Sequence, residues 1–332
     1  MHVPDGFFTA PVAIGAGVVA AAAVAVSLRK AKTELDDRTA PMAGLVAAFI
    51  FAVQMLNFPI AAGTSGHLLG GALAAILVGP YTAVLCVSVV LAVQGFFFAD
   101  GGLTALGINV VLMAIIPSAL GWGVFQLVTR VARNRASVVA GSFVAALISV
   151  PIAALTFAVL FVLGGTAPIE TGAVFAAMGG VHVLVGIGEG LITAVTVSSV
   201  LAVRPDLVYG ARFLTKPLVL KTATGEQVVE PARPEPVKPL RPFLVGAVAV
   251  ALVLAGVVSF FASSSPDGLE RVAEDEGFIG AATDHAFGGF ALADYGDVGG
   301  IPVGIAGIIG VVITLLVGGA ILWSVRQKTT AA

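Results

Sequence analysis

Residues 1–32 read MHVPDGFFTAPVAIGAGVVAAAAVAVSLRKAK, and the order of the parts in this stretch constrains the whole fold. Residues 10–28 form an apolar, alanine-rich segment that is typical of a membrane-spanning helix. The basic cluster at residues 29–32 follows this segment, whereas a secretory signal carries its positive charge in front of the apolar region. We therefore expect the segment to be retained, with the N-terminus outside the cell and Met1 kept in the mature chain.

The composition indicates a polytopic membrane protein. Of the 332 residues, 58% are hydrophobic and only 11% are charged, and the mean hydropathy is +1.05. Soluble globular domains carry about 25% charged residues. The net charge of −2 leaves no basic surface for nucleic acid. The single cysteine, Cys86, lies in an apolar run, which excludes an intrachain disulfide and a cysteine-based metal site.

The apolar segments predict an all-α polytopic fold with nine membrane helices. A bilayer crossing takes about 20 residues. The apolar run from Leu68 to Ala99 is too long for one helix and is broken at Gly79-Pro80, so it is read as two helices, the first of them short. The predicted helices are at 7–28, 41–58, 67–79, 81–99, 104–129, 138–164, 172–202, 243–261 and 301–324.

The distribution of lysine and arginine orients these helices in the membrane. Loops on the cytoplasmic side are enriched in both residues. With the N-terminus outside, only Arg271 of the 17 basic residues falls on the outer side. We therefore expect a seven-helix bundle that ends inside and a two-helix module that returns the chain to an inside C-terminus. Met1, His67, Asp100 and the 262–300 loop then share the outer side.

A linker separates the two modules. Prolines alternate with charged residues from Glu230 to Pro239, a composition that favours an extended, solvated spacer. We therefore expect a seven-helix membrane domain at 1–202, a cytoplasmic linker at 203–242 and a two-helix module with an acidic external loop at 243–332. The outer loop of this module holds eight acidic residues and one basic residue between Asp267 and Asp297. Such a loop can attract cations or contact a partner, and it is equally the usual composition of a solvated loop.

The first two residues can chelate a metal ion. The α-amino group of Met1, the backbone nitrogen of His2 and the His2 imidazole can close two fused rings around one ion. A second imidazole would complete four nitrogens in a plane, the geometry expected of Ni(II), Cu(II) and some Co(II) sites. His67 is the leading candidate, because the predicted topology puts it on the same side as Met1. The alternative is that His2 is an ordinary polar residue at a frayed terminus.

His67 lies in the stretch NFPIAAGTSGHLLGG at residues 57–71. Thr64 or Ser65 is expected to cap the following helix, which would place His67 in the first turn. A histidine at this depth is costly without a partner, and the partner is either a metal ion or a backbone carbonyl. Together with an external Met1-His2, the metal becomes the favoured partner of His67.

Further polar residues near the outer helix ends are candidates to support the ligands. We expect Ser65, Gln94 and Asn109 to hold the imidazoles in one tautomer and orientation. Hydrogen bonding between helices is the alternative role for Gln94 and Asn109. Glu189, the deepest acidic residue, follows His182 by seven positions on one helix face. For Glu189 we favour structural pairing over a proton relay or a cation site.

A competing interpretation is an intramembrane protease. Residues 63–66 read GTSG, which fits the G-x-S-G pattern of rhomboid-type serine proteases, with Ser65 as nucleophile and His182 in a later helix. This interpretation explains neither the N-terminal sequence nor the second module.

Taken together, these motifs resemble the CbiM/NikM substrate-capture (S) components of energy-coupling-factor (ECF) transporters. The resemblance spans residues 1–202. Residues 243–324 resemble the small CbiN/NikN-like partner, which is fused here to the first domain as a PDGLE module. The motifs are MHVPDG at 1–6, NFP at 57–59, GTSGHL at 63–68, GP at 79–80, Gln94 with DGG at 100–102, LGIN at 106–109 and PDGLE at 266–270.

The resemblance implies uptake of Ni(II) or Co(II) as the transported substrate, with no resident cofactor. It implies a metal held by the Met1 amine, the amide nitrogen and imidazole of His2, and the His67 imidazole. It also implies a coupling membrane protein and ABC-type ATPase subunits as partners, in the cell membrane of a prokaryote. The sequence has no G-x-x-x-x-G-K-[ST] motif, so we expect a transporter component and no enzyme. A stand-alone metal permease or sensor remains the alternative.

Overall fold

The computed structural model describes residues 1–332 except 62, 215–217, 223–224, 230–238 and 328–332. The fold is all-α, as predicted. In the described part of the chain, seven helices are long and apolar enough to cross a membrane. They are α1 (Ala10–Lys30), α4 (Pro80–Val93, continued by η2, Gln94–Phe98), α5 to α6 (Leu106–Asn109, η3 Val110–Ile115, Ile116–Val131), α7 (Arg135–Gly164), α8 (Thr171–Val203), α9 (Leu240–Gly256, followed by η6, Val258–Phe261) and α11 (Val303–Val325).

Two predicted helices are shorter than expected. Helix α2 covers Thr39–Gln54, and α3 covers only Gly71–Val78. Every residue of α3 is buried among the other helices. Because α3 does not face lipid, it does not have to span the thickness of the bilayer. The prediction that Thr64 or Ser65 caps α3 was wrong. The residue before α3 is Gly70, whose φ of +84° ends the preceding loop, and no side chain caps the helix.

The predicted break at Gly79-Pro80 is present and has a clear cause. Gly79 has a φ of +100°, a conformation that favours glycine, and Pro80 is the first residue of α4. The carboxylate of Glu34 accepts hydrogen bonds from the backbone nitrogens of Tyr81 (3.2 Å) and Thr82 (2.7 Å). Glu34 therefore satisfies amide groups at the start of α4 that have no partner within the helix.

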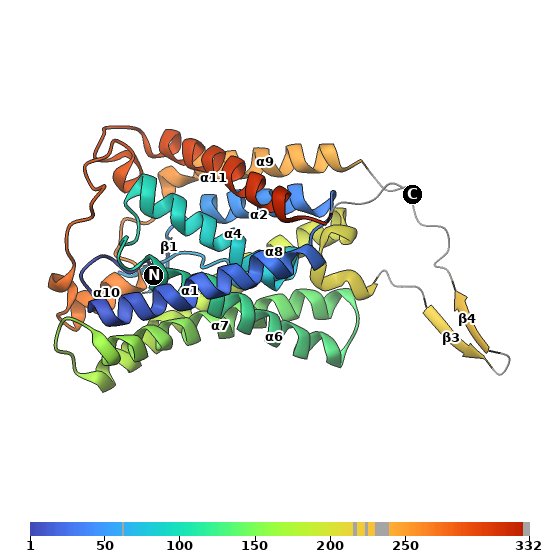
Figure 1. Cartoon of the computed structure of the whole chain (residues 1–332), viewed down its shortest axis with the longest axis horizontal. Coiled ribbons are helices and arrows are strands. Elements are labelled where there is room, and N and C mark those ends of the chain that lie inside the picture. The colour runs from blue at the N-terminus through green and yellow to red at the C-terminus, as the bar shows by residue number, and fades with distance from the viewer. Residues whose placement is uncertain (62, 215–217, 223–224, 230–238, 328–332) are drawn as a thin grey trace.

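Short elements connect the helices. A two-residue hairpin pairs β1 (Phe58–Pro59) with β2 (Ser65–Gly66). At the opposite end of the molecule, β3 (Leu218–Thr222) pairs antiparallel with β4 (Gly225–Val229), so the predicted linker includes a hairpin (Figure 1). Most of the proline-rich run lies outside the described residues. Helix α10 (Gly268–Asp275) lies in the loop between α9 and α11.

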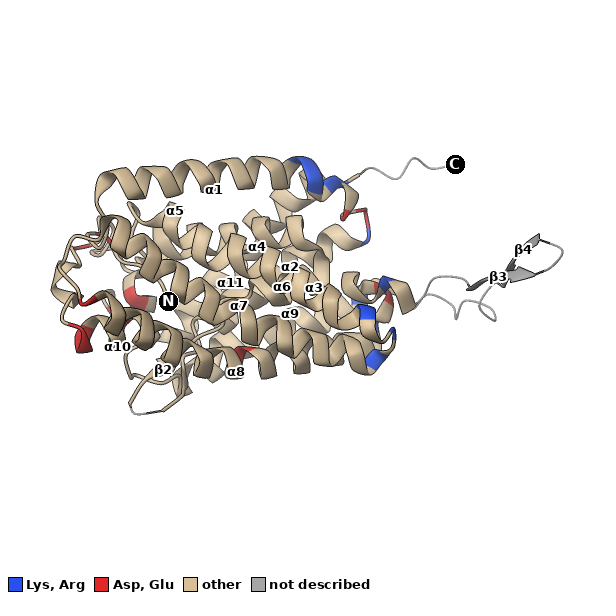
Figure 2. Ribbon diagram, turned by 90° about the horizontal axis from the view of Figure 1, so that it is seen from below, with Lys and Arg blue, Asp and Glu red and all other residues tan. Residues whose placement is uncertain are grey.

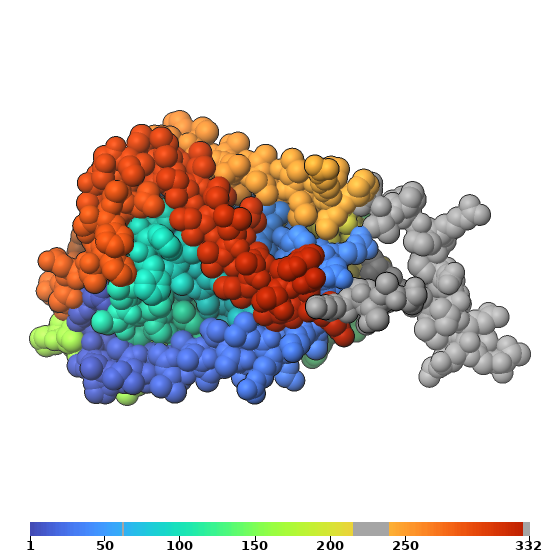
Figure 3. All heavy atoms as spheres, turned by 45° about the horizontal axis from the view of Figure 1, so that its top comes forward, coloured from blue at the N-terminus to red at the C-terminus, as the bar shows by residue number. Residues whose placement is uncertain are grey.

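The C-terminal module packs along the bundle. Helices α9 and α11 both contact α2, and Figure 3 shows the orange-to-red segment lying along one side of the molecule. A Cβ atom added to Gly44 of α2 would lie 2.9 Å from Cα of Gly319 in α11. Glycine allows this close backbone approach, which is a common way for membrane helices to associate.

The basic residues are unevenly distributed along the helix axes. Lysine and arginine residues gather at the end where α1 finishes, whereas the end that holds the N-terminus and α10 is marked by acidic residues (Figure 2). By the positive-inside rule, the acidic end with Met1 is the outer end. The loops at this end bring residues 1–9, the hairpin before His67 and the PDGLE segment together.

Glu189 of α8 fixes the loop that carries His67. Its carboxylate is fully buried and accepts hydrogen bonds from the backbone nitrogens of Leu69 (2.6 Å) and Gly70 (3.1 Å). These amide groups precede α3 and would otherwise lack partners away from water. The arrangement matches the structural role favoured for Glu189, with backbone amides as its partners.

We predict that Glu189→Gln lowers the melting temperature of the detergent-solubilised protein. Glutamine keeps the size of the side chain but turns one acceptor into a donor that faces an amide N–H. A buried group left unsatisfied costs about 1–3 kcal/mol. The matched control is Glu274→Gln on the exposed face of α10, which should leave the melting temperature unchanged. Equal melting temperatures for Glu189→Gln and the wild type would contradict this role.

Candidate functional site

The N-terminal segment is buried within the outer end of the bundle. Met1 is 2% exposed and Val3 is fully buried. The backbone nitrogen of Val3 donates to Oδ1 of Asn109 (2.8 Å), and Nδ2 of Asn109 donates to the carbonyl oxygen of Val3 (3.1 Å). Asp5 accepts hydrogen bonds from the backbone nitrogens of Leu103 (3.2 Å) and Thr104 (2.7 Å). The interpretation of a frayed terminus is therefore wrong for this structure.

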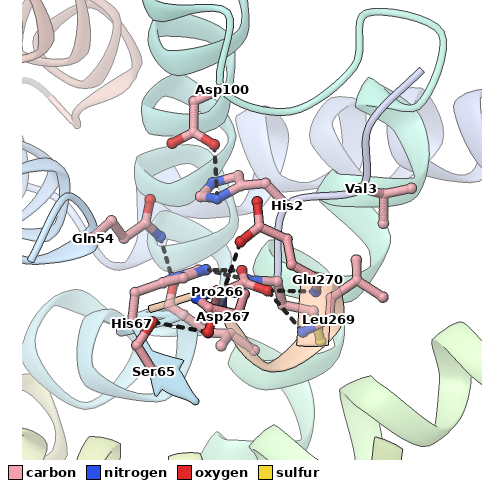
Figure 4. Close-up of polar contacts among 12 residues, drawn as sticks. His2, Val3, Gln54, Ser65, His67, Asp100, Pro266, Asp267, Leu269 and Glu270 are labelled. Atoms are coloured by element: carbon pink, nitrogen blue, oxygen red, sulfur yellow. Dashed lines mark hydrogen bonds and ion pairs between the residues drawn. The ribbon is translucent and has the colours of Figure 1, made fainter. Parts of the chain in front are cut away.

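The Met1 amine and His67 meet although 66 residues separate them. The amine contacts Nε2 of His67, and the amine also forms an ion pair with Oδ2 of Asp267 at 2.5 Å (Figure 4). Nδ1 of His67 donates to the carbonyl oxygen of Leu68 at 3.1 Å. Because a carbonyl only accepts, the proton is on Nδ1, and Nε2 presents its lone pair toward the amine.

The His2 imidazole lies beside the His67 imidazole. The two rings stack with centroids 4.9 Å apart. Nε2 of His2 lies 3.2 Å from Oε1 of Gln94, and Nδ1 lies 3.2 Å from Oδ1 of Asp100. Burial lowers the pKa of His2 to about 4, although Asp100 partly offsets this effect. The imidazole is therefore neutral near pH 7 and keeps one lone pair.

Asp267 is a site residue that the sequence did not reveal. It is the D of the PDGLE motif and was predicted only as part of an acidic loop. Its Oδ1 caps α10 by accepting from the backbone nitrogens of Leu269 (2.7 Å) and Glu270 (3.0 Å), while Oδ2 faces Met1 and lies 3.3 Å from Nε2 of His67. Burial raises the pKa of Asp267, but the positive charge of the Met1 amine lowers it by more, so the pKa lies well below the usual range.

The three predicted supporting residues have different contacts. Gln94 contacts the His2 imidazole. Asn109 forms its hydrogen bonds with the backbone of Val3, the residue that follows His2. Ser65 donates to the carbonyl oxygen of Ser265 (2.8 Å), and its backbone nitrogen donates to the carbonyl oxygen of Pro266 (2.9 Å). Ser65 therefore anchors the segment that presents Asp267.

The protease interpretation lacks its catalytic pair. The hydroxyl of Ser65 is used by Ser265, and Nδ1 of His182 donates to the carbonyl oxygen of Met178 at 2.8 Å. Among the described residues, no hydrogen bond joins Ser65 to His182. A nucleophile and its base need such a contact.

The arrangement can bind a cation through nitrogen. A cavity of about 560 Å³ is lined in part by His2, His67, Asp100 and Asp267. Over the described part of the chain, no group of three or more His, Cys, Asp or Glu side chains is arranged to hold a metal ion. Metal binding at this place would therefore need main-chain nitrogen beside the two imidazoles, and the Met1 amine is in contact with one of them.

Comparisons with known proteins agree with this architecture. The profile of a family described as "Cobalt uptake substrate-specific transmembrane region" (CbiM) matches residues 2–207, and that of the PDGLE domain matches residues 241–327. A putative metal transport protein of Haloquadratum walsbyi is 39% identical over 63% of this chain and 94% of its own length. A putative fused nickel transport protein, NikMN, of Archaeoglobus fulgidus is 38% identical over 63% of this chain and 68% of its own length.

A solved structure has the same fold. The crystal structure of a transition metal transporter matches with a TM-score of 0.55 and 29% identity, and the match covers 61% of this chain and 93% of that one. The matching relatives are metal transport proteins, and the seven apolar helices place this chain in a prokaryotic membrane. The chain belongs to the CbiM family of metal-uptake membrane proteins, and it carries a PDGLE domain in the same polypeptide.

Proposed function

We propose that this protein is the substrate-capture component of an ECF-type importer and that it binds Ni(II) or Co(II) at the N-terminal site. The proposed ligands are the Met1 amine, the amide nitrogen and imidazole of His2, and the His67 imidazole. The convergence of the amine and the two imidazoles in one buried place at the outer end carries this proposal.

The chemistry of these donors favours a late transition metal. The amide nitrogen of His2 lies between the amine and the imidazole along the chain, so any metal bound to both is next to this amide. The amine and amide close a five-membered ring, and the amide and Nδ1 close a six-membered ring. Replacing an amide proton requires a strongly polarising ion, which favours Ni(II) or Cu(II) over Zn(II) or Mg(II).

The choice between nickel and cobalt stays open in this proposal. The fused relative is named for nickel transport, and the family profile is named for cobalt uptake. Nitrogen donors of this kind suit both ions.

The proposed importer also includes partner subunits. The sequence holds no P-loop, so ATP hydrolysis must come from ATPase subunits that act through a coupling membrane protein. A proton-coupled permease would need a titratable group along the transport path. Glu189, the deepest acid, is instead committed to the backbone nitrogens of Leu69 and Gly70.

We predict that His67→Ala abolishes high-affinity metal binding, because it removes one of four donors. Isothermal titration calorimetry with Ni(II) and Co(II) on protein with an untagged N-terminus measures the effect. The loss should exceed the roughly 10–100-fold that removal of an outer-shell partner costs. His285→Ala, in the same cavity, is the control and should keep the affinity. Binding by His67→Ala at wild-type affinity would refute the ligand set.

We also predict that insertion of one alanine between Met1 and His2 abolishes binding while the protein still accumulates in the membrane. The insertion enlarges the chelate and moves the amine away from His67. Calorimetry in buffers of different ionisation enthalpy gives a second readout. Wild-type protein should release one proton from the ammonium group and one from the His2 amide on binding. Metal binding without release of an amide proton would remove this nitrogen from the proposed ligands.

A further inference from the structure

A second cavity lies between the PDGLE domain and the CbiM region. It has a volume of about 540 Å³ and is bounded mainly by α2, α8 and α9. Ligand cavities in proteins usually measure roughly 300–1,000 Å³. Helix α9 packs against α2 and α11, and Figure 1 shows α9 lying beside α2. The lining is almost entirely apolar, and on α9 it includes Phe243, Gly246, Ala247 and Val250.

The cavity lies in the inner half of the bilayer. Its lining comes from the first part of α2 and of α9 and from the last part of α8. The start of α2, the start of α9 and the end of α8 all lie at the basic, cytoplasmic end of the bundle. The lining of α9 runs from Pro242 to Val250, which is about 12 Å along a helix. One hydrocarbon leaflet is about 15 Å thick, so the cavity has nearly the depth of a leaflet.

An arginine with an unused nitrogen lies at the cytoplasmic end of this cavity. Arg204 follows Val203, the last lining residue of α8, and is only 3% exposed. Its Nε and Nη2 donate to the carboxylate of Asp206 at 2.9 and 2.7 Å. Its Nη1 is buried and has no hydrogen-bond partner in the described part of the chain. The guanidinium carbon lies 6.0 Å from the centre of the Phe243 ring, which lines the cavity.

The charges around Arg204 favour an anion. Asp206 also lies 3.6 Å from Arg38, so this one carboxylate is shared between two arginines. Arg241 adds an exposed positive charge at the start of α9. A buried N–H group is costly without an acceptor, and native proteins rarely leave one unpaired. The place therefore suits a negatively charged acceptor that enters beside an apolar cavity.

An anionic phospholipid has both of these parts. Its phosphate oxygens accept strong hydrogen bonds from guanidinium groups, and its acyl chains match the apolar lining. Basic pockets between membrane helices on the cytoplasmic side are known places for acidic lipid headgroups. A helix of a partner subunit fits less well. A helix about 10 Å across over the same depth would need roughly 900 Å³, which is more than the cavity provides.

We propose that the cavity between α2, α8 and α9 binds an anionic phospholipid of the cytoplasmic leaflet, with the acyl chains in the cavity and the phosphate on Nη1 of Arg204. The lipid joins the PDGLE domain to the CbiM region at the cytoplasmic end, as Asp267 does at the outer end. The inference is independent of the proposed metal ligands, which lie at the opposite end of the bundle.

Gly246 allows the cavity to be filled without disturbing the backbone. It lines the cavity, and a Cβ atom added to it has no heavy atom within 4 Å. Gly246→Leu therefore places a side chain in the space proposed for the acyl chains. Gly123→Leu on α6 is the matched control, because Gly123 has equally open surroundings and does not line this cavity. Both changes replace glycine by a better helix former.

The experiment measures bound lipid on the full chain by native mass spectrometry. The protein is equilibrated in mixed micelles that contain phosphatidylglycerol or phosphatidylcholine. Wild-type protein should retain one phosphatidylglycerol per chain and bind it at least about five-fold more tightly than phosphatidylcholine, since each arginine near an anionic headgroup contributes about this factor. Gly246→Leu should lose the bound lipid, and Gly123→Leu should keep it.

Two arginine variants test the headgroup contact. Arg204→Gln and Arg241→Gln should each weaken phosphatidylglycerol binding by about five-fold and leave phosphatidylcholine binding unchanged. Because Arg204 also binds Asp206, the exposed Arg241 provides the test that leaves this ion pair intact. Inorganic phosphate in tenfold excess should not displace the lipid, because it lacks the acyl chains.

Several results would overturn the lipid site. They are equal retention of the two lipids by the wild type, retention of phosphatidylglycerol by Gly246→Leu at the wild-type level, and displacement of the lipid by inorganic phosphate. Loss of copurifying coupling subunits from Gly246→Leu with its lipid still bound would assign the cavity to a partner helix instead. Wild-type protein that retains phosphatidylglycerol but binds neither Ni(II) nor Co(II) would overturn the proposed function and support the lipid site.

Discussion

The outer end of this protein depends on a buried ion pair between the Met1 amine and Asp267. An ammonium group away from water is very costly unless a counter-charge and further hydrogen-bonding partners surround it. Asp267 supplies the charge at 2.5 Å, and Nε2 of His67 supplies an acceptor. Other residues at the outer end hold these partners in place. Asn109 holds the chain at Val3, Ser65 anchors the PDGLE segment, and Glu189 fixes the loop after His67.

This ion pair also links the CbiM region of the chain to the PDGLE domain. Met1 at the start of the chain supplies the amine, the CbiM region supplies both imidazoles, and the PDGLE domain supplies Asp267. The carboxylate that balances the amine would have to yield this contact when a metal replaces the ammonium proton. In the proposed function, binding is therefore an exchange of one positive charge for another within a site that already holds compensating negative charge. That property suits a site that must both take up and release its ion.

The sequence predicted the all-α fold, because apolar runs and basic clusters report on membrane crossing and orientation. The sequence also predicted that Met1, His2 and His67 lie at one end, because the predicted topology puts all three on the outer side. The predicted start of α3 was wrong. The observed start depends on the left-handed backbone of Gly70 and on the carboxylate of Glu189, which accepts a hydrogen bond from the Gly70 backbone nitrogen. No local pattern records such long-range hydrogen bonds.

The residues of the PDGLE domain were harder to assign. Asp267 belonged to a visible motif, but an acidic loop has the same appearance whether or not one of its carboxylates is buried against an amine. Tyr295, whose hydroxyl group contacts Gln94 and Asp100, belonged to no motif at all. It lies in a turn in which Asp294 and Tyr295 both have a left-handed backbone conformation. These are properties of the assembled fold.

The covalent link between the two regions has a consequence for their association. When two modules share one chain, their docking is intramolecular and proceeds at an effective concentration set by the connection. Residues 203–242 provide that connection here. The contact of Asp267 with the amine is therefore independent of how many copies of the protein the membrane holds, and neither dilution in lipid nor unequal synthesis can separate the two halves of the site.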